Sequence, residues 1–422
     1  MPTSTLLQLV ARGRQDVYLT GEPQFTFFKH VYRRHTPFAI ESIPIEFDGN
    51  ADFGQRISCL IPRKADLLGP LFLEIDLPPL PQPLPQPSPN DGPTNFWVND
   101  IGHAIIKDVS IEIGDKEIDK HTGEWLNIWG ELTTPVGKRD GYYNMVGHWP
   151  DYPPISSVAA QPLHLSIPLR FWFCNTIGAA LPLIALQAHP VRLIIHLRPF
   201  RELWWSSAME NNCGACIPWS YSPVSPSRIQ LFGDYYFLEK EERQRFASAE
   251  HEYLIDQLQI SPPQSVSAGT THTNCSLMFN HCCKEFIWVV QRDAMQCANE
   301  WFNYSSDYFG SVTGDDLLSS AMLRLDGYDR FYQRNAVYFR RTQPYQYHTN
   351  VPDNFIYLYS FALRPEEHQP SGTMNASKID DIILSLRFPA ALSTDQRTVS
   401  VFAVNYNILR IIGGLGGLAF IA

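Results

Sequence analysis

The sequence predicts an all-β protein built from two similar halves. Apolar and polar residues alternate over 109–113, which is the period of a strand with one buried face. A turn at Gly114-Asp115 and an extended stretch to Asp119 complete a strand–turn–strand unit. The segment 323–331 repeats this unit around Asp326-Gly327, with Leu323 following Ile111 by 212 residues. Because 212 is close to half of the 422 residues, the pattern indicates a tandem repeat.

Alternating stretches predict further strands along the whole chain. Pro44 marks the earliest of them as an edge strand, because proline cannot donate to a ladder. A second pair of stretches, 191–200 and 403–412, has the same offset of 212. Short strands punctuated by turns, with no long amphipathic helix, predict a sandwich or barrel in each half. The predicted strands are 43–47, 57–61, 71–77, 165–169 and 191–197, then 229–238, 287–291, 323–325, 355–362, 382–388 and 399–407.

Only short helices are predicted. Residues 123–129 favour a helix that places Trp125 and Trp129 on one face, four residues apart. The charged stretch 239–246 predicts one or two helical turns at the start of the second half.

Three segments are predicted to be loops or turns. Residues 78–89 contain seven prolines in twelve positions, which indicates a stiff polyproline-type loop, or a ligand for a proline-binding groove. Residues 137–162 are rich in turn formers and are expected to form a long exposed loop. The glycines of 413–417 have no helix after them to hold a phosphate, so they predict a close-packed turn or a flexible tail.

Charge argues against a nucleic-acid-binding protein. The chain carries 33 basic and 43 acidic residues, a formal net charge of −10. Residues 1–40 are the exception, with five basic and two acidic side chains among many aromatics. We interpret 1–40 as a solvated or interface segment, and a site for phosphates or lipid headgroups is the alternative. Within it, the aromatic and basic stretch 25–34 favours an arm or short helix that packs on its own barrel or on a neighbour, and nucleic-acid binding is the alternative.

The expected compartment is the cytoplasm. The apolar stretch 6–11 is too short for a signal peptide, and the apolar tail 399–422 carries Asn405 and Arg410, which is unlike a membrane span. Eight cysteines, including the adjacent Cys282-Cys283, do not form a disulfide framework and fit a reducing environment.

No motif predicts a metal site or a cofactor site. Cys213 and Cys216 could be half of a zinc site, and His281 with Cys282-Cys283 could complete it only through folding. Buried thiols and loop cysteines are the preferred interpretation.

No motif predicts catalysis either. Asp315-Asp316 and Asp380-Asp381 could bind calcium or act in acid–base catalysis, but adjacent acids in turns are usually solvated. The prediction is therefore no catalytic residue, no cofactor and no metal ligand. Three sequons, at Asn274, Asn303 and Asn375, are not expected to be glycosylated, because no secretory signal precedes them.

Long ordered motifs resemble the major capsid proteins of nucleocytoplasmic large DNA viruses. They begin with Leu6-Leu-Gln-Leu-Val-Ala11, Gln15-Asp-Val-Tyr-Leu-Thr-Gly21 and Phe27-Phe-Lys-His-Val-Tyr-Arg-Arg-His35. The resemblance covers nearly the whole chain. The remaining motifs are Trp97-Val-Asn-Asp-Ile-Gly-His-Ala104, Ile118-Asp-Lys-His121, Pro168-Leu-Arg-Phe-Trp-Phe-Cys174, Leu181-Pro-Leu-Ile-Ala-Leu186, His251-Glu-Tyr-Leu-Ile255, Ile287-Trp-Val-Val-Gln291, Gln343-Pro-Tyr-Gln346, His348-Thr-Asn350, Ser360-Phe-Ala-Leu-Arg-Pro-Glu-Glu-His-Gln-Pro-Ser-Gly372 and Asn405-Tyr-Asn-Ile-Leu-Arg410.

The resemblance implies a double jelly roll, that is, two tandem eight-stranded antiparallel jelly rolls with short helices and long loops. The expected domains are an N-terminal arm at 1–26, a first jelly roll at 27–216, a linker at 217–227 and a second jelly roll at 228–422. The Cys-, Pro- and Ser-rich break in composition around 213–226 sets the linker.

The resemblance also implies the function. Family members form homotrimers whose six barrels make a pseudo-hexagonal capsomer, and capsomers tile an icosahedral shell around an internal membrane. The expected partners are further copies of the chain, neighbouring capsomers, minor capsid, cement and penton proteins, and the inner membrane near the arm, with no direct nucleic acid. The expected location is the virion capsid, assembled in the host cytoplasm.

Two alternatives stay open at this point. The chain could be a minor or vertex-associated capsid paralogue. A carbohydrate-binding jelly-roll protein is the alternative from a different class, suggested by the many Trp and Tyr residues.

Overall fold

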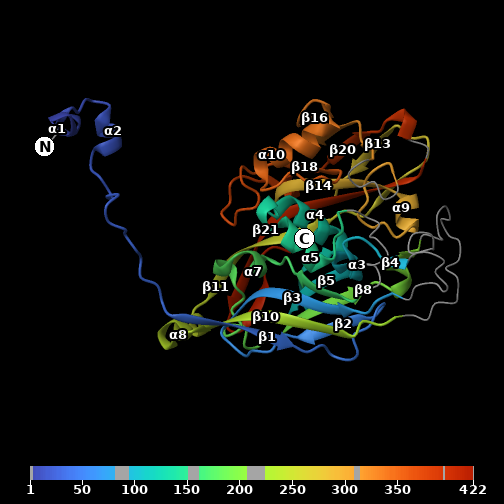
Figure 1. Cartoon of the computed structure of the whole chain (residues 1–422), viewed down its shortest axis with the longest axis horizontal. Helices are drawn as coiled ribbons and strands as arrows, with labels where there is room; N and C mark the ends of the chain where they lie inside the picture. The colour runs from blue at the N-terminus through green and yellow to red at the C-terminus, as the bar shows by residue number, and fades with distance from the viewer. Residues whose placement is uncertain are drawn as a thin grey trace. The chain divides into compact units, whose positions relative to one another are not determined.

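The structure is a computed structural model that describes residues 3–80, 95–150, 161–206, 224–307, 314–392 and 395–421. The chain divides into two compact units, Met1–Phe38 and Ala39–Ala422. The first unit, the arm, contains helices α1 (Thr3–Val10) and α2 (Asp16–Thr20). The second unit, the body, contains the β-sheets (Figure 1).

The first sandwich of the body consists of two four-stranded sheets. One sheet has the order β1-β10-β3-β7, and the other has the order β2-β8-β5-β6. The strand bounds are β1 (Phe38–Ile45), β2 (Arg56–Leu60), β3 (Leu67–Leu77), β5 (Ile106–Ile113), β6 (Lys116–Thr122), β7 (Leu163–Pro168), β8 (Val191–Leu197) and β10 (Arg228–Leu238). A separate two-stranded sheet pairs β4 (Asn95–Trp97) with β9 (Trp204–Ser206).

The second sandwich repeats this arrangement with the orders β11-β21-β14-β18 and β13-β20-β15-β16. Its main strands are β11 (His251–Ile260), β13 (His272–Ser276), β14 (Cys282–Arg292), β15 (Ser320–Leu325), β16 (Tyr328–Asp329), β18 (Ile356–Ser360), β20 (Ile382–Arg387) and β21 (Arg397–Ile412). Short strands extend the two sheets: β12 (Gln264–Val266), β17 (Arg334–Asn335), β19 (Met374–Asn375) and β22 (Leu415–Leu418).

The two sandwiches have the same topology. When the short extra strands are set aside, each contains eight strands, and the first, eighth, third and sixth form one sheet in both. The second, seventh, fourth and fifth form the other sheet. This is the jelly-roll connection pattern, so the predicted double jelly roll is confirmed.

Both predicted hairpins are present at equivalent positions. Gly114 and Asp115 have φ values of 60° and 62°, and Asp326 and Gly327 have 50° and 79°. Positive φ at both central residues is the type I′ geometry that matches strand twist. The first turn joins β5 to β6 and the second joins β15 to β16.

The strand at 229–238 was predicted correctly, but its assignment to the second half is wrong. This strand is β10, which pairs with β3 and forms the eighth strand of the first sandwich. The segments 191–200 and 403–412, although 212 residues apart, also do not occupy equivalent places in the two sandwiches. The first contains β8, which corresponds to β20, and the second belongs to β21, which corresponds to β10. Alternating strands look alike in sequence, so one shared offset does not identify a pair. The predicted linker, 217–227, lies mostly outside the described residues.

The helices of the body are short and lie mainly in the connections. The predicted loop at 137–162 is wrong in its first part, because 136–146 forms helix α5, and residues 151–160 lie outside the described residues. Most of the proline-rich segment 78–89 also lies outside them. The helices are α3 (Ile101–Ile105), α4 (Gly123–Thr133), α5 (Val136–Val146), α7 (Trp172–Asn175), α8 (Lys240–Ser248), α9 (Asp293–Cys297) and α10 (Gln343–Tyr347), with a π-helical turn η4 (Tyr338–Thr342) and 3-10 turns η1 (Ile177–Ala179), η2 (Phe200–Glu202), η5 (Ala376–Lys378) and η6 (Ala390–Leu392).

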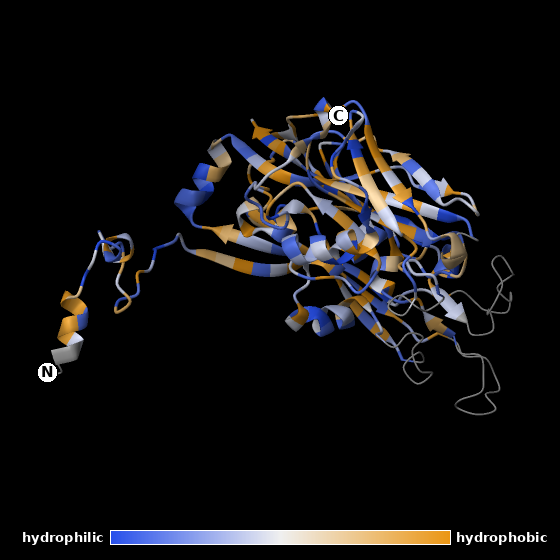
Figure 2. Ribbon diagram, turned by 90° about the horizontal axis from the view of Figure 1, so that it is seen from above, coloured by the Kyte–Doolittle hydropathy of each residue, from blue (hydrophilic) through white to orange (hydrophobic). Residues whose placement is uncertain are grey.

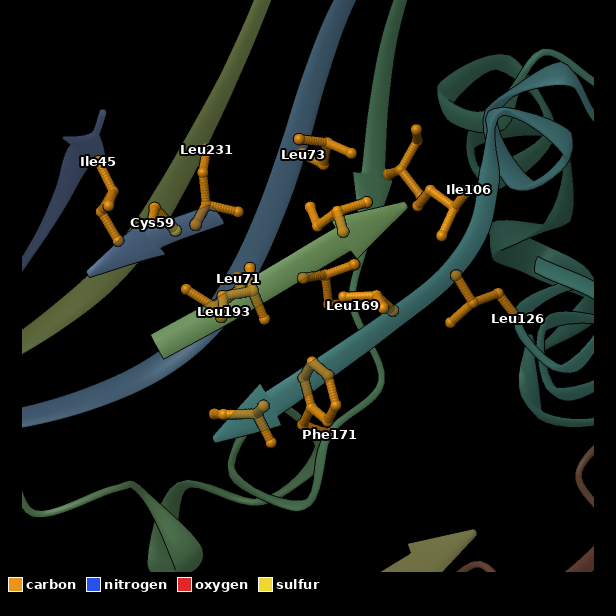
Figure 3. Close-up of a cluster of buried hydrophobic side chains, with 14 of the residues drawn as sticks. Ile45, Cys59, Leu71, Leu73, Ile106, Leu126, Leu169, Phe171, Leu193 and Leu231 are labelled. Carbon is orange, nitrogen blue, oxygen red and sulfur yellow. The ribbon is translucent and has the colours of Figure 1, made fainter. Parts of the chain in front are cut away.

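Each sandwich encloses its own apolar core. In the first, Leu71, Leu193 and Leu231 project from both sheets into the space between them (Figure 3). The alternation of hydrophobic and hydrophilic residues along the strands follows from this arrangement (Figure 2). The neighbouring central strands β14 and β21 depart from this alternation, because nine of eleven and twelve of sixteen of their residues are buried.

Candidate assembly surfaces

A seam joins the two sandwiches, and β6 of the first sandwich and β11 of the second form part of it. The backbone N–H of Leu258 on β11 donates to a carboxylate oxygen of Asp119 on β6 at 3.1 Å. The side-chain amide of Gln257 donates to the carbonyl of Ile118. Asp119 also contacts His121 at 3.0 Å, and both side chains are almost fully buried. The edge of the first sandwich is therefore covered by the edge of the second.

Helix α4 links the two cores. The hydroxyl of Thr122 accepts a hydrogen bond from the N–H of Trp125 at 3.2 Å and caps the helix. Trp125, Ile128 and Leu132 pack in the core of the second sandwich, whereas Leu126 packs in the core of the first. Trp125 and Trp129 share one face, as predicted, and their rings stack with centroids 5.2 Å apart. The ring of Trp125 also lies 5.6 Å from that of Phe402 on β21, centroid to centroid.

Polar contacts fix the C-terminal end of α4. The side-chain amide of Asn350 donates to the carbonyl of Glu131 at 2.7 Å, and its oxygen accepts from Arg139 of α5 at 2.8 Å. Arg139 also pairs with Asp353 at 3.3 Å. Burial raises the pKa of Glu131 to about 7, and the nearby Asp100 adds to the shift.

Two further contacts cross the seam near β8 and β9. The guanidinium of Arg198 lies 3.8 Å from the ring centroid of Trp301, and the indole N–H of Trp301 donates to the carbonyl of Glu202 at 2.8 Å. The side-chain amide of Asn299 donates to the carbonyls of Arg201 and Trp204, at 3.0 and 3.1 Å. Cation–π stacking combined with hydrogen bonds restricts rotation about the seam.

The C-terminal glycines hold the opposite end of the seam. They form the turn of a hairpin between β21 and β22, so the flexible-tail alternative is wrong. The carbonyl of Gly414 accepts a hydrogen bond from the N–H of Ala188 at 3.0 Å. A Cβ on Gly416 would lie 2.7 Å from a terminal methyl group of Leu186, so a larger residue here would force that side chain to shift. These contacts join the two sandwiches within one compact unit.

A buried ionic cluster lies within the second sandwich, next to the seam. His348 is fully buried between Glu285, 2.8 Å from its Nε2, and Glu366, 2.9 Å from its Nδ1. Burial alone would lower the pKa of His348, but the two carboxylates outweigh it and raise the pKa to about 9. The buried Lys284 pairs with Asp256 at 3.0 Å. These charges are paired with one another, which is typical of structural networks.

The paired aspartates that could have bound calcium or acted in catalysis have structural contacts. The N–H groups of Asp380 and Asp381 donate to a carboxylate oxygen of Asp326 at 2.9 and 3.0 Å, which anchors the second hairpin turn. Asp316 accepts from the hydroxyl of Tyr357 and pairs with Arg340 at 3.4 Å.

The cysteine pairs give no metal site in the described part of the chain. Burial raises the pKa of the Cys283 thiol to about 12, which disfavours the thiolate that binds metals. Cys213 and Cys216 lie outside the described residues. Among the described residues, no group of three or more His, Cys, Asp or Glu side chains could hold a metal ion.

Exposed apolar side chains gather on two parts of the molecule. The arm exposes Leu7 by 70%, Tyr18 by 92% and Phe28 by 98%. In the body, the segment 328–345 exposes Tyr328 by 81% and Tyr332 by 87%, with several arginines between the aromatic side chains. Large exposed apolar patches on soluble chains mark interaction sites. Among the described helices, none combines the length and hydrophobicity that a membrane crossing requires.

Family comparisons identify what kind of protein carries these surfaces. A model described as "Major capsid protein N-terminus" matches residues 26–239, and one described as "Large eukaryotic DNA virus major capsid protein" matches residues 242–417. The chain belongs to the major capsid protein family of large eukaryotic DNA viruses. The match to residues 26–239 ends after β10, in agreement with the place of this strand in the first sandwich.

Related major capsid proteins align with the chain over almost its entire length. The major capsid protein of Pyramimonas orientalis virus is 40% identical and covers 98% of each chain. The major capsid protein of Phaeocystis pouchetii virus is 37% identical over 98% of this chain and 99% of its own length.

Solved capsid structures show the same fold. A chain of the quasi-atomic model of the PBCV-1 virus capsid matches with a TM-score of 0.78 and 32% identity, over 94% of this chain and 100% of the other. The Faustovirus major capsid protein matches with a TM-score of 0.74 at 12% identity, over 97% and 96% of the two chains. At that identity the match concerns the fold alone.

Proposed function

We propose that this chain is the structural tile of an icosahedral virus shell and acts as a homotrimer. The supporting observation is that both sandwiches have the same strand order and lie within one compact unit of the chain. Three copies around a threefold axis present six similar sandwiches, which gives a near-hexagonal block that packs in a flat lattice. The role is structural rather than catalytic, as it is for the related capsid proteins.

The shell supplies the partners of this tile. They are further copies of the chain, neighbouring capsomers, and minor capsid, cement and penton proteins. The arm is proposed to reach these neighbours or the inner membrane, because its apolar side chains are exposed and its charge is net basic. Direct contact with nucleic acid is not part of the proposal, since the chain carries a net charge of −10. Assembly is proposed to take place in the host cytoplasm.

The composition of purified particles tests this role. A bulk tile should be the protein with the most copies in the particle, as measured by quantitative mass spectrometry. A chain that lacks residues 1–26, which include both helices of the arm, should still fold but should not be incorporated into particles, because the shortened arm then cannot reach its partners. A low copy number of the intact chain would contradict the role as the bulk tile. Normal incorporation of the truncated chain would contradict the role of the arm.

A further inference from the structure

The seam inside the chain shows how one sandwich receives the next. The β6 edge of the first sandwich is covered by β11 of the second, through the contacts of Ile118 and Asp119 described above. Ile118 is only 3% exposed and Asp119 only 4% exposed. No backbone ladder is present between β6 and β11 in the described residues, so side chains carry the contact.

The equivalent edge of the second sandwich is uncovered. β16 occupies the place of β6, and the offset of 212 aligns Lys116 with Tyr328 and Lys120 with Tyr332. Both tyrosines are more than 80% exposed. The surface that contains them, residues 328–341, is called the β16 surface below. It has the composition of a protein-binding site, since Tyr and Arg dominate binding energy at interfaces.

The arginines of the β16 surface are already positioned. The guanidinium of Arg334 lies 4.6 Å from the ring centroid of Tyr338, and that of Arg330 lies 5.9 Å from the ring centroid of Tyr359. Stacking on aromatic rings limits the freedom of long side chains, so less conformational entropy is lost when they bind a partner.

The equivalent of β11 is uncovered as well. β1 occupies the place of β11 at the edge of the first sandwich. Only one of the ten residues of β11 is exposed, whereas six of the eight residues of β1 are exposed. Glu41 and Glu46 are exposed on and next to β1, so this edge is acidic where the β16 surface is basic. An open apolar edge strand is a liability that proteins normally cover.

We propose that the β16 surface of one copy docks onto β1 of a second copy, and that this contact repeats between chains the seam that β6 and β11 form within the chain. The inference rests on the proposed trimer. The two surfaces differ, so the contact is heterologous, and a heterologous contact must either close into a ring or form a filament. Each sandwich would then be related to the next one by the same kind of contact, either within a chain or between chains. If each such contact rotates the next sandwich by about a sixth of a circle, the six sandwiches of three copies close the ring.

Charge reversal tests the contact. The double variant Arg330→Glu, Arg334→Glu should raise the protein concentration at which half of the chains are trimeric by about tenfold or more. The reason is that two new glutamates on the β16 surface would then face the acidic edge at β1. Adding Glu41→Lys and Glu46→Lys to the same chain should restore the trimer. The matched control is Arg364→Glu, which reverses an arginine that is 70% exposed on the same sandwich away from the β16 surface.

The readout is light-scattering mass as a function of concentration, with circular dichroism to verify the fold. If a reversed chain does not fold, Tyr332→Ala provides the milder variant, since this side chain is 87% exposed. A wild-type trimer that is unchanged by the β16 variants would overturn the docking proposal and leave the proposed trimer intact. A monomeric wild-type chain would overturn both.

Discussion

At the residue scale, the buried charges of this protein stabilise structure. His348 illustrates this, because both of its ring nitrogens contact carboxylates in a site without solvent access. A histidine whose folded pKa is raised adds stability below its unfolded pKa of about 6.5, and this stability is lost as the pH rises through the folded pKa. For His348 the loss extends from about pH 6.5 to about 9.

The variant His348→Gln tests this pH dependence. At pH 6 it should lower the free energy of unfolding by about 3 kcal/mol, because it leaves Glu285 buried without its counter-charge. The difference from wild type should shrink as the pH approaches 9. Urea unfolding at several pH values measures both effects. His164→Gln is the control, since that histidine pairs with Asp76 at a side-chain exposure of 61%. A difference that does not depend on pH would contradict the account.

The sequence could not reveal this cluster. Glu285 lies 63 residues before His348 and Glu366 lies 18 residues after it, and only the fold brings the three together. The prediction that no residue is catalytic remains a prediction. Adjacent pairs such as Asp380-Asp381 are visible in sequence, but their hydrogen bonds to Asp326 depend on the register of β15 and β20.

At the scale of elements, α4 shows both the strength and the limit of sequence reasoning. The helix and the placement of Trp125 and Trp129 on one face follow from local spacing, and both are confirmed. The insertion of Trp125 into the second core depends on tertiary contacts and has no local signal. The same reason explains β10, whose alternation predicts a strand but does not identify its partner strand.

The variant Trp125→Ala tests the role of α4. It should lower the free energy of unfolding by about 3–5 kcal/mol, the usual cost of removing a large buried aromatic side chain. Helix α4 places Leu126 in the first core and Trp125 in the second. The loss of stability should therefore be seen in the unfolding of both sandwiches together. Val136→Ala, at a position 70% exposed in α5, should change stability by less than about 0.5 kcal/mol. Calorimetry that shows an unaffected second sandwich would contradict the linkage.

At the scale of the whole molecule, the central property is near-symmetry. The two type I′ hairpins are its clearest sign in sequence, because a turn with positive φ at both positions restricts residue choice more than a strand does. Two similar sandwiches in one chain are not by themselves sufficient for a capsid building block. The seam joins the two sandwiches, and the proposed docking of further copies uses the exposed edges at β1 and β16.

The mass of the purified protein in solution tests this account most directly. Multi-angle light scattering should give about 144 kDa, three times the chain mass of 48.1 kDa, at micromolar concentration and neutral pH. A ring of three copies has no free contact surface left, so the mass should reach a plateau as concentration increases. A stable mass near 48.1 kDa under the same conditions would contradict the claim that the chain is a self-associating capsid tile.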